Sequence, residues 1–404
     1  MDGAEIFGTL MTPAGRANPY PVYEAAHKLG SVIPAGGGYL VVGYPDVNQL
    51  LRDNAFGVAD DETRSTWDPA WRDVPSVVSM AASILHSNAP DHGRMRSLIS
   101  SVFTPRRVHA LEPTIAAATD RLLDGLADRG AAGTAVDFMA EFSYQLPVSV
   151  ICELIGVPEA ERDRFRILAT DLAAVLDFVS EMSALEAADV AAVELKELFT
   201  ALVAERRAAP RDDLASALVA VCDADDGTLS EVELLANLTL LLIAGFETTA
   251  NLFGNGLVQL FEHPDVAAAL RAGEIGYQGF IDEVLRYDSP VQMTSRTAMA
   301  DDATIGGVRV ERGMEVAVLI GAANRDPHRY SDAGRFDPTR TDINPLSFGA
   351  GVHFCVGSVL ARLEAATAFP RLVSRFPALA SGGEPIRNSR LLLRGYEHLP
   401  VTVS

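Results

Sequence analysis

Cysteine is scarce in this chain, which has 404 residues and three cysteines, Cys152, Cys222 and Cys355. Because their number is odd, they lie far apart and no CxxC pair exists, the sequence argues against a disulfide framework and a cysteine-rich zinc site. A hydrophobic core must therefore hold the fold together, and a 48% share of hydrophobic residues is enough to build one.

Basic residues are also in short supply. The chain has 33 lysines and arginines and 54 aspartates and glutamates, which gives a net charge of -21. A nucleic-acid-binding protein needs a basic face, and so does a protein that docks on an anionic membrane surface. The charge balance argues against both kinds of partner.

Export and membrane-spanning signals are missing as well. The first residues lack the basic start and apolar core of a secretory signal. The longest apolar stretch, residues 234–246, contains Asn237 and Thr239 and is too short to span a bilayer. The sequence therefore predicts a soluble, cytoplasmic protein.

Repeats and low-complexity linkers are absent, and the middle of the chain carries apolar residues at helical spacing. Helices are predicted over residues 110–129, 159–180 and 183–208. Short strand-like runs lie at residues 38–42, 304–310 and 316–319. We expect a mainly α fold with a minor β part drawn from both ends of the chain, which favours a single domain over residues 1–404.

The longest predicted helix starts at a capping-box pattern, Thr228-Leu-Ser-Glu231, and meets no proline before Pro264. This allows roughly 33 helical residues, or about 50 Å. The centre of the helix is apolar on nearly every face, so we expect it to cross the middle of the protein.

That centre carries an unusual sequence, Ala-Gly-Phe-Glu-Thr-Thr, at residues 244–249. Gly245 costs about 1 kcal/mol relative to alanine, and the hydroxyls of Thr248 and Thr249 compete for carbonyls of the preceding turn. One hypothesis is a widened turn that holds water or a small molecule, with Glu247 and Thr248 passing protons. The alternative is a small-residue crossing point between packed helices.

A second unusual stretch, SFGAGVHFCVGSVLAR at residues 347–362, places Gly349, Gly351 and Gly357 around Cys355. Glycines let the backbone approach a flat or bulky partner closely, and a helix that follows places the sulfur near its N-terminus. Such a position favours the thiolate, which is a nucleophile or a metal ligand.

The role of this cysteine has several interpretations. A nucleophile would use His353 as its base, whereas a metal ligand without a second cysteine indicates haem rather than zinc. A small hydrophobic residue in a tight turn is a third interpretation. Dinucleotide binding is disfavoured because the GxG lacks its third glycine and follows no clear strand.

Two charged pairs lie at helical spacing. Glu283 and Arg286 share a helix face in the run IDEVLRY, where a buried structural ion pair is favoured over an exposed one. His92 and Arg96 are one helical turn apart, so both aim at the same point, as suits a carboxylate or phosphate. A solvated basic face is the alternative for this second pair.

Taken together, these segments resemble a bacterial cytochrome P-450, a haem-thiolate monooxygenase, of the kind that tailors secondary metabolites in actinobacteria. The resemblance covers nearly the whole chain and includes ANPYPVYEAAHKLG, NAPDHGRMRSLISSVFTPRRV, LLIAGFETTA, EVLRYDSPV, ANRDPHRY, RFDPTR and SFGAGVHFCVGSVLAR. It implies the cytochrome P-450 fold, with haem b between the long central helix and the cysteine-bearing loop and helix.

The resemblance also implies roles for individual residues. Cys355 would be the axial ligand of the haem iron, and Glu247 and Thr248 would be the acid–alcohol pair for dioxygen activation. The other haem-binding residues would be His92, Arg96, Ala244, Arg296, Phe348, Gly349, His353 and Gly357. A buried network of Glu283, Arg286 and Arg340 would fix the cysteine loop.

The implied substrate pocket is largely apolar. Its expected lining is Val78, Ile84, Asn237, Leu241, Ala244, Val291, Met293, Thr294 and Leu392. Asn237 and Thr294 are the expected hydrogen-bond donors, with the alternative that a neighbouring helix satisfies Asn237. An acidic ferredoxin would dock on a basic patch formed by Arg94, Arg106, Arg107 and Arg362.

The predicted reaction inserts one oxygen atom of O2 into a C–H bond of a largely apolar polyketide- or macrolide-type molecule. Because the chain has no flavin or nicotinamide domain, a separate ferredoxin and its NAD(P)H-dependent reductase would supply electrons to a monomeric enzyme. Epoxidation, desaturation or ring coupling on the same haem are alternatives. A haem sensor or carrier without turnover is the alternative from another class.

Overall fold

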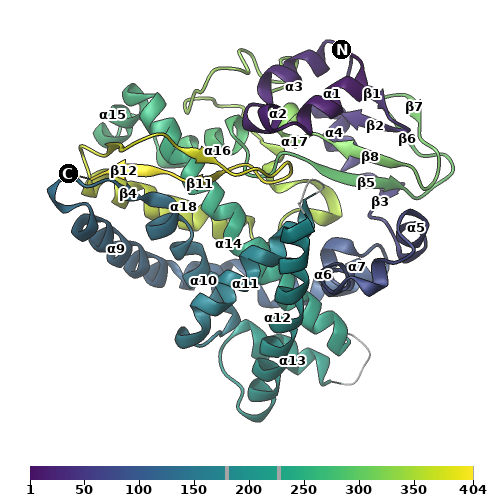
Figure 1. The fold of residues 1–404 in the computed structure, drawn as a ribbon, viewed down its shortest axis with the longest axis horizontal. Helices are drawn as coiled ribbons and strands as arrows, with labels where there is room; N and C mark the ends of the chain where they lie inside the picture. The colour runs from purple at the N-terminus through teal and green to yellow at the C-terminus, as the bar shows by residue number, and fades with distance from the viewer. Residues whose placement is uncertain (178–181, 225–228, 404) are drawn as a thin grey trace. The chain divides into compact units, whose positions relative to one another are not determined.

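The computed structural model describes residues 1–177, 182–224 and 229–403. The chain divides into two compact units. The first unit comprises residues 1–57, 112–146 and 248–404, and the second comprises residues 58–111 and 147–247. Helices dominate both units and the strands are short, as the sequence predicts (Figure 1).

The first unit holds the β structure together with helices from both ends of the chain. Its helices are α1 (Gly3–Leu10), α2 (Pro13–Ala17), α3 (Tyr20–His27), α4 (Tyr44–Leu50), α9 (Glu112–Arg129), α15 (Pro264–Ala272), α16 (Tyr277–Tyr287), α17 (Ile320–Ala323) and α18 (Ser358–Arg375). Its strands are β1 (Val32–Ala35), β2 (Gly38–Val41), β3 (Phe56–Gly57), β4 (Val136–Asp137), β5 (Thr294–Ala298), β6 (Thr304–Ile305), β7 (Val308–Arg309), β8 (Glu315–Val318), β9 (Ala380–Ser381), β10 (Ile386–Arg387), β11 (Tyr396–His398) and β12 (Pro400–Thr402).

The second unit is helical in the part of the chain that the structure describes. Its helices are α5 (Asp61–Trp67), α6 (Pro75–Ala81), α7 (Asp91–Val102), α8 (Pro105–Ala110), most of α10 (Gln145–Ile155), α11 (Arg162–Leu172), α12 (Met182–Ala208) and α13 (Leu214–Cys222). The long helix α14 (Glu231–Glu262) contributes to both units.

The main sheet brings segments from opposite ends of the chain side by side (Figure 1). Its five strands run in the order β1-β2-β8-β5-β3. Strand β2 pairs in parallel with β8, with Tyr39 opposite Val316, while β8 pairs antiparallel with β5, with Val318 opposite Thr294. Val316 and Val318 are fully buried, which secures this register because a shift by one residue would expose them.

Several predicted elements are confirmed with small changes. The helix predicted at 110–129 is α9, and the one at 183–208 is α12. The helix predicted at 159–180 is shorter: α11 is flanked by single 3-10 turns at Glu159–Glu161 and Ala173–Leu176, and residues 178–180 lie outside the described part.

The strand predicted at 304–310 is wrong in one respect, because it forms two strands. Gly306 and Gly307 both have positive φ, at 55° and 77°, and they reverse the chain between β6 and β7. Two adjacent glycines with positive φ are typical of a two-residue hairpin turn.

Helix α14 has 32 residues, close to the predicted length, but its capping box differs from the predicted one. Thr228 lies outside the described residues. The box is formed two residues later: the Glu233 amide donates to Ser230 Oγ at 3.3 Å, and the Ser230 amide donates to Glu233 Oε2 at 2.8 Å. The predicted pair, Thr228 and Glu231, and the observed pair, Ser230 and Glu233, have the same spacing. An ion pair with Arg94 holds Glu233 in the observed capping box.

By length and composition α14 could cross a membrane, yet 61% of its most apolar 18-residue window is buried inside the protein. A core helix of a soluble protein passes the same test of length and composition.

Small residues let neighbouring helices approach α14 closely. A Cβ atom at Gly256 would lie 2.5 Å from Cζ of Phe369, which belongs to α18.

This contact predicts the effect of adding one methyl group. Gly256→Ala should lower the free energy of unfolding by about 1–3 kcal/mol, because overpacking against the Phe369 ring outweighs the better helix propensity of alanine. Chemical denaturation of the holoenzyme measures this change.

The matched control is Gly8→Ala in α1, where an added Cβ meets nothing within 4 Å. This variant should be unchanged or more stable by up to about 1 kcal/mol. Equal stability of the two variants would contradict close packing at Gly256.

Candidate active site

The cysteine loop has a specific backbone path. Gly349 and Gly351 have φ of 70° and 68°, and a Cβ at Gly351 would lie 2.2 Å from the Leu51 carbonyl oxygen. The Cys355 amide donates to the Phe348 carbonyl at 2.9 Å, which closes the loop. Cys355 is exposed and lies just before α18, whose first residue is Ser358. The helix predicted to follow the cysteine is therefore confirmed, and the sulfur lies near a helix N-terminus.

Hydrogen bonds tie the start of this loop to α16 and to the end of α17. Ser347 Oγ donates to the Leu285 carbonyl at 2.5 Å, and Asn324 Nδ2 donates to Ser347 Oγ at 2.9 Å. The Leu346 amide donates to Asn324 Oδ1 at 2.7 Å. Since Asn324 is fully buried, these bonds are shielded from water and hold the loop in one position.

The buried ion pair predicted between Glu283 and Arg286 is present. Both side chains are 0% exposed, and Arg286 Nη2 lies 2.7 Å from Glu283 Oε1. Arg286 Nη1 donates to the Asn324 carbonyl at 3.0 Å and to the Ala333 carbonyl at 2.9 Å. Arg340 joins the pair, with its Nε 3.3 Å from Glu283 Oε1. Asn324 therefore contacts both the ion pair and the cysteine loop.

Arg296, on β5, is a buried cation whose hydrogen-bond partners among the described residues are all neutral. Its side chain donates to the Ser295 carbonyl at 2.7 Å and to Thr294 Oγ1 at 3.4 Å. No carboxylate among the described residues forms an ion pair with it, and burial lowers its pKa to about 10. Because a buried charge is costly without a partner, this geometry calls for an anion beside Arg296.

One stripe of α14 is less covered than the rest of the helix. Leu241, Gly245 and Thr248 are partly exposed and Ala244 is exposed, whereas the residues between them on the other faces are buried. This spacing follows one helical face. Glu247, which lies off the stripe, is buried with 5% exposure.

The two hypotheses for residues 244–249 have different outcomes. The α-helix is continuous through these residues, so the structure does not support a widened turn. A Cβ at Gly245 would lie 2.7 Å from Cγ1 of Ile151, which supports the close helix crossing with α10. The accessible stripe nevertheless leaves Ala244 and Thr248 able to face a ligand.

The second unit contains the predicted haem-binding residues His92, Arg96 and Ala244 and part of the predicted pocket, while His353 and Gly357 belong to the first unit. His92 and Arg96 lie one turn apart on α7, and His92 is buried. Asn237 Oδ1 accepts from the Ile84 amide at 3.0 Å, and Asn237 Nδ2 donates to the Glu233 carbonyl at 2.8 Å. The structure thus favours the alternative in which Asn237 is satisfied within the protein. Val78 is 42% exposed.

In the first unit, the other predicted pocket residues lie on two paired segments. Val291 forms a β-bridge with Leu393, and the Gln292 amide donates to the Leu392 carbonyl at 2.8 Å. Met293 is buried and Thr294 is partly exposed. The pairing brings the segment that holds Val291, Met293 and Thr294 beside the segment that holds Leu392.

Three of the four arginines predicted to receive a ferredoxin have carboxylate partners. Arg94 pairs with Asp91 and Glu233, Arg107 with Asp212, and Arg362 with Asp282. Arg106 is exposed. The positive charge that these four arginines can offer to an acidic ferredoxin is therefore smaller than the sequence suggests.

Sequence reasoning missed two polar features of the first unit. Asn251, 0% exposed, has no hydrogen-bond partner in the described part of the chain for either atom of its amide group, and it lies one turn after Thr248. The sequence signal for Asn251 was the placement of Asn251, Asn255 and Gln259 at four-residue spacing in an apolar helix.

The second missed feature is Asp288, which is 2% exposed and pairs with Arg387 and Arg394. Burial raises the pKa of Asp288, but the two arginines and Tyr20 hold it below its usual range.

Comparison with known proteins identifies the family. The family model described as Cytochrome P450 matches residues 42–275 and 277–395. The chain is 39% identical to the 6-deoxyerythronolide B hydroxylase of Saccharopolyspora erythraea, over 95% of each chain. It is 41% identical to cytochrome P450 107B1 of the same organism, over 90% of this chain and 88% of that one.

A solved structure agrees over the same length. The ligand-free structure of Mycobacterium smegmatis CYP164A2 has a TM-score of 0.87 and 37% identity, and covers 99% of this chain and 100% of that one. The protein belongs to the cytochrome P450 family, whose members use haem b and incorporate oxygen from O2. It is accordingly a cytochrome P450 monooxygenase.

The described residues fit haem b. An exposed cysteine at a helix N-terminus, in a loop opened by positive-φ glycines, suits an axial ligand beneath a flat macrocycle. Among these residues Arg296 has no anionic partner, and a propionate is an anion of the required kind.

The ion-pair network predicts a large effect of a small change. Glu283→Gln keeps the side-chain volume but leaves the Arg286 charge buried without its partner, so stability should fall by at least about 3 kcal/mol. Denaturant unfolding of the holoenzyme, followed by far-UV circular dichroism, measures the loss.

Asp282→Asn is the control, because it breaks a partly exposed pair with Arg362 and should cost less than about 1 kcal/mol. If the two variants lost equal stability, the buried pair would have no special structural importance.

Proposed function

We propose that this cytochrome P450 hydroxylates a largely apolar secondary metabolite of polyketide or macrolide type, with electrons from a separate ferredoxin and reductase. The observation that carries the proposal is the exposed Cys355, held at the N-terminus of α18 in a hydrogen-bonded loop. When bound, haem b supplies the iron at which O2 is activated. The substrate class rests on the apolar residues expected in the pocket and on the similarity to a macrolactone hydroxylase.

Cys355 is proposed as the axial ligand, and its surroundings support that role. Phe348 lies at the start of the loop, and the guanidinium carbon of Arg362 lies 4.5 Å from the centre of its ring. Phe348 is proposed to lie beside the sulfur and to shield it from water when haem is bound. The Glu283, Arg286 and Arg340 network is proposed to fix the loop through Asn324.

The propionate-binding role is proposed for Arg296, with His92, Arg96 and His353. Arg296 carries this proposal best, because its guanidinium is buried and uses only a neighbouring carbonyl and hydroxyl as partners among the described residues. Ala244, Gly349 and Gly357 are proposed to leave room for the macrocycle, since each presents little or no side chain.

Glu247 and Thr248 are proposed to deliver protons. Thr248 lies on the accessible stripe of α14, where its hydroxyl can hold a water, and the Glu247 carboxyl is its neighbour in the chain. The buried amide of Asn251, one turn further on, has hydrogen-bonding capacity to hold another water. Glu247, Thr248 and Asn251 thus offer hydrogen-bond donors and acceptors along which protons are proposed to move.

Isotope labelling tests the proposed reaction. The purified enzyme, with a surrogate ferredoxin, its reductase and NADH, should consume NADH only when a substrate is present and place one 18O atom from 18O2 in the product. A library of macrolactones and other apolar metabolites, screened for low-to-high-spin shifts, would find that substrate.

The outcomes separate the alternatives. Product that carries no 18O would indicate desaturation or ring coupling, and an epoxide would identify the other oxygen-inserting outcome. Ligand binding without any NADH consumption would support a sensor or carrier and contradict the proposal.

Thr248→Ala tests proton delivery. This variant should keep haem and substrate binding but form product about 100-fold more slowly or worse, because a positioned acid–base group contributes on this scale. Most electrons should instead appear as hydrogen peroxide released into solution. Product and peroxide are both measured per NADH consumed.

The control is Thr200→Ala, an exposed threonine of α12 whose hydroxyl donates to the Lys196 carbonyl. It should leave coupling unchanged. Wild-type yield of product per NADH in Thr248→Ala would exclude the proposed role of the hydroxyl.

A further inference from the structure

One buried amide joins the long helix α14 to two segments that are far away in the sequence. Asn255 lies on α14 and is 0% exposed. Its Nδ2 donates to the Asp288 carbonyl at 2.9 Å and to the Arg394 carbonyl at 3.0 Å. Its Oδ1 accepts from Arg387 Nη1 at 3.1 Å. The opposite orientation of the amide would place Oδ1 against two carbonyl oxygens, so the partners select the observed one.

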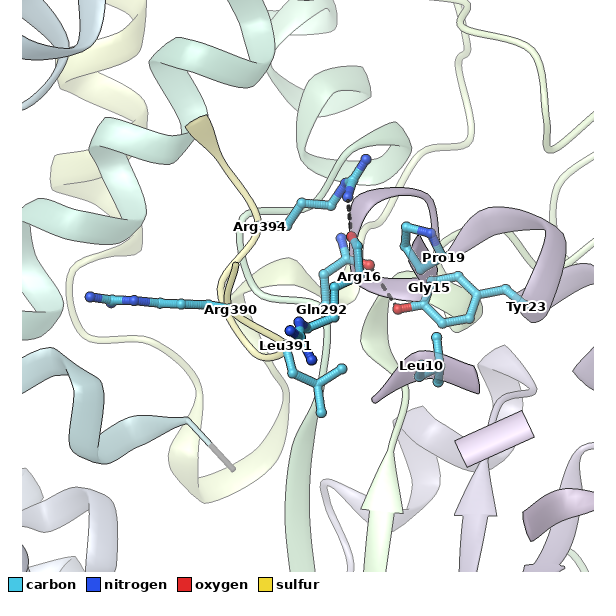
Figure 2. A pocket seen from close by; sticks show the side chains of 9 residues that line it. All are labelled: Leu10, Gly15, Arg16, Pro19, Tyr23, Gln292, Arg390, Leu391 and Arg394. Atoms are coloured by element: carbon cyan, nitrogen blue, oxygen red, sulfur yellow. Dashed lines mark hydrogen bonds between the residues drawn. The ribbon is translucent and has the colours of Figure 1, made fainter. Parts of the chain in front are cut away.

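The two carbonyls belong to segments that pair with each other, residues 288–294 and 391–395. We call them the paired segments. The Gln292 amide donates to the Leu392 carbonyl at 2.8 Å, and Figure 2 shows Gln292 of the first segment beside Leu391 of the second. The paired segments hold several of the residues that are predicted to line the substrate pocket. Asn255 therefore fixes this part of the predicted pocket to α14 at two points.

Close packing supports the connection at a third point. Gly395 ends the second paired segment, and a Cβ atom there would lie 1.8 Å from Oδ1 of Asn251. Asn251 is buried on α14, one turn before Asn255. Because Gly395 has no side chain, the backbone of the segment lies directly against the helix.

Asn255 differs from the other polar side chains at this spacing on α14. Gln259 Nε2 donates to Glu262 of the same helix at 3.4 Å, and Asn251 has no hydrogen-bond partner in the described part of the chain. Thr248 lies seven residues before Asn255, which is two turns and about 10 Å along one helix face. A single helix thus carries both the amide that holds the paired segments and the hydroxyl that is proposed to deliver protons.

We propose that Asn255 is a positioning residue that sets where the substrate lies relative to Thr248, and thereby which C–H bond is oxidised. The paired segments would contact the substrate, and the bonds of Asn255 and the contact at Gly395 set their distance from α14. A displacement of about 1 Å is enough to disturb the alignment of reacting atoms. This inference rests on the proposed function, because it takes the paired segments as walls of the pocket.

Two azoles of different size test the position of this wall without turnover. Imidazole and econazole both bind haem iron through a ring nitrogen, but econazole is large enough to contact the pocket walls. Both are titrated against the holoenzyme, and dissociation constants are read from the Soret shift. Asn255→Asp keeps the side-chain volume and the acceptor for Arg387, but it replaces the donor to the two carbonyls with an oxygen that repels them. Econazole should bind about tenfold more weakly, because the wall is no longer preorganised, and imidazole should bind unchanged.

Gly395→Ala is a second variant that acts by a different route. The added methyl group should push the second paired segment away from α14 and leave Asn255 intact, so it should weaken econazole selectively as well. Amide hydrogen exchange supplies a readout that needs no ligand. Peptides that cover residues 288–294 and 391–395 should exchange faster in both variants than in the wild type. If Asn255→Asp does not bind haem, Gly395→Ala carries the test.

Ser143→Ala is the matched control. It removes a buried hydrogen bond to α14, from Ser143 Oγ to the Ala250 carbonyl at 2.8 Å, that reaches neither paired segment. Binding of both azoles and exchange of the two peptides should be unchanged. Oxidation of methyl dodecanoate, with a surrogate ferredoxin, its reductase and NADH, adds the ratio of hydroxylated positions. This ratio should change in Asn255→Asp and Gly395→Ala and stay constant in Ser143→Ala.

Equal weakening of imidazole and econazole in Asn255→Asp would indicate general damage to the haem site and overturn the proposal. So would econazole binding and peptide exchange that match the wild type, or an unaltered ratio of products. If the wild type oxidises neither methyl dodecanoate nor any macrolactone, the proposed function fails, whereas azole binding and peptide exchange still decide the role of Asn255.

Discussion

The buried pair between Glu283 and Arg286 is the interaction on which the candidate site depends. Both side chains are completely buried, and removing two charges from water has a large desolvation cost. The attraction between the two charges does not by itself offset this cost. The pair persists because the carbonyls of Asn324, Ala333 and Arg335 accept the remaining guanidinium protons, and the Asp337 amide donates to Glu283. The network therefore specifies one arrangement of the chain.

That arrangement reaches the cysteine through Asn324. The carbonyl of Asn324 belongs to the ion-pair network, while its side chain holds Leu346 and Ser347 at the start of the cysteine loop. The positive-φ glycines then set the path of the loop up to Cys355 and α18. A side chain held in this way is oriented before any metal binds, as effective metal sites require of their ligands.

Local patterns in the sequence predicted much of this. Apolar spacing predicted α9 and α12, and the glycines around Cys355 predicted a tight loop before a helix. Contacts between distant residues were beyond such reasoning. Nothing in the sequence tells that Ile84 satisfies Asn237, that Glu233 occupies Arg94, or that Arg296 has only neutral partners among the described residues. The capping box was misplaced because two positions share one spacing, and tertiary contact with Arg94 distinguishes them.

The central claim is that the Cys355 thiolate is the axial ligand, and the spectrum of the reduced carbon monoxide complex tests it most directly. Wild type, Cys152→Ser and Cys222→Ser should all show the red-shifted Soret band of a thiolate ligand. Cys355→His should bind haem without that band, because imidazole replaces the thiolate. A wild-type protein that never shows the band, or a Cys355→His variant that retains it, would contradict the account.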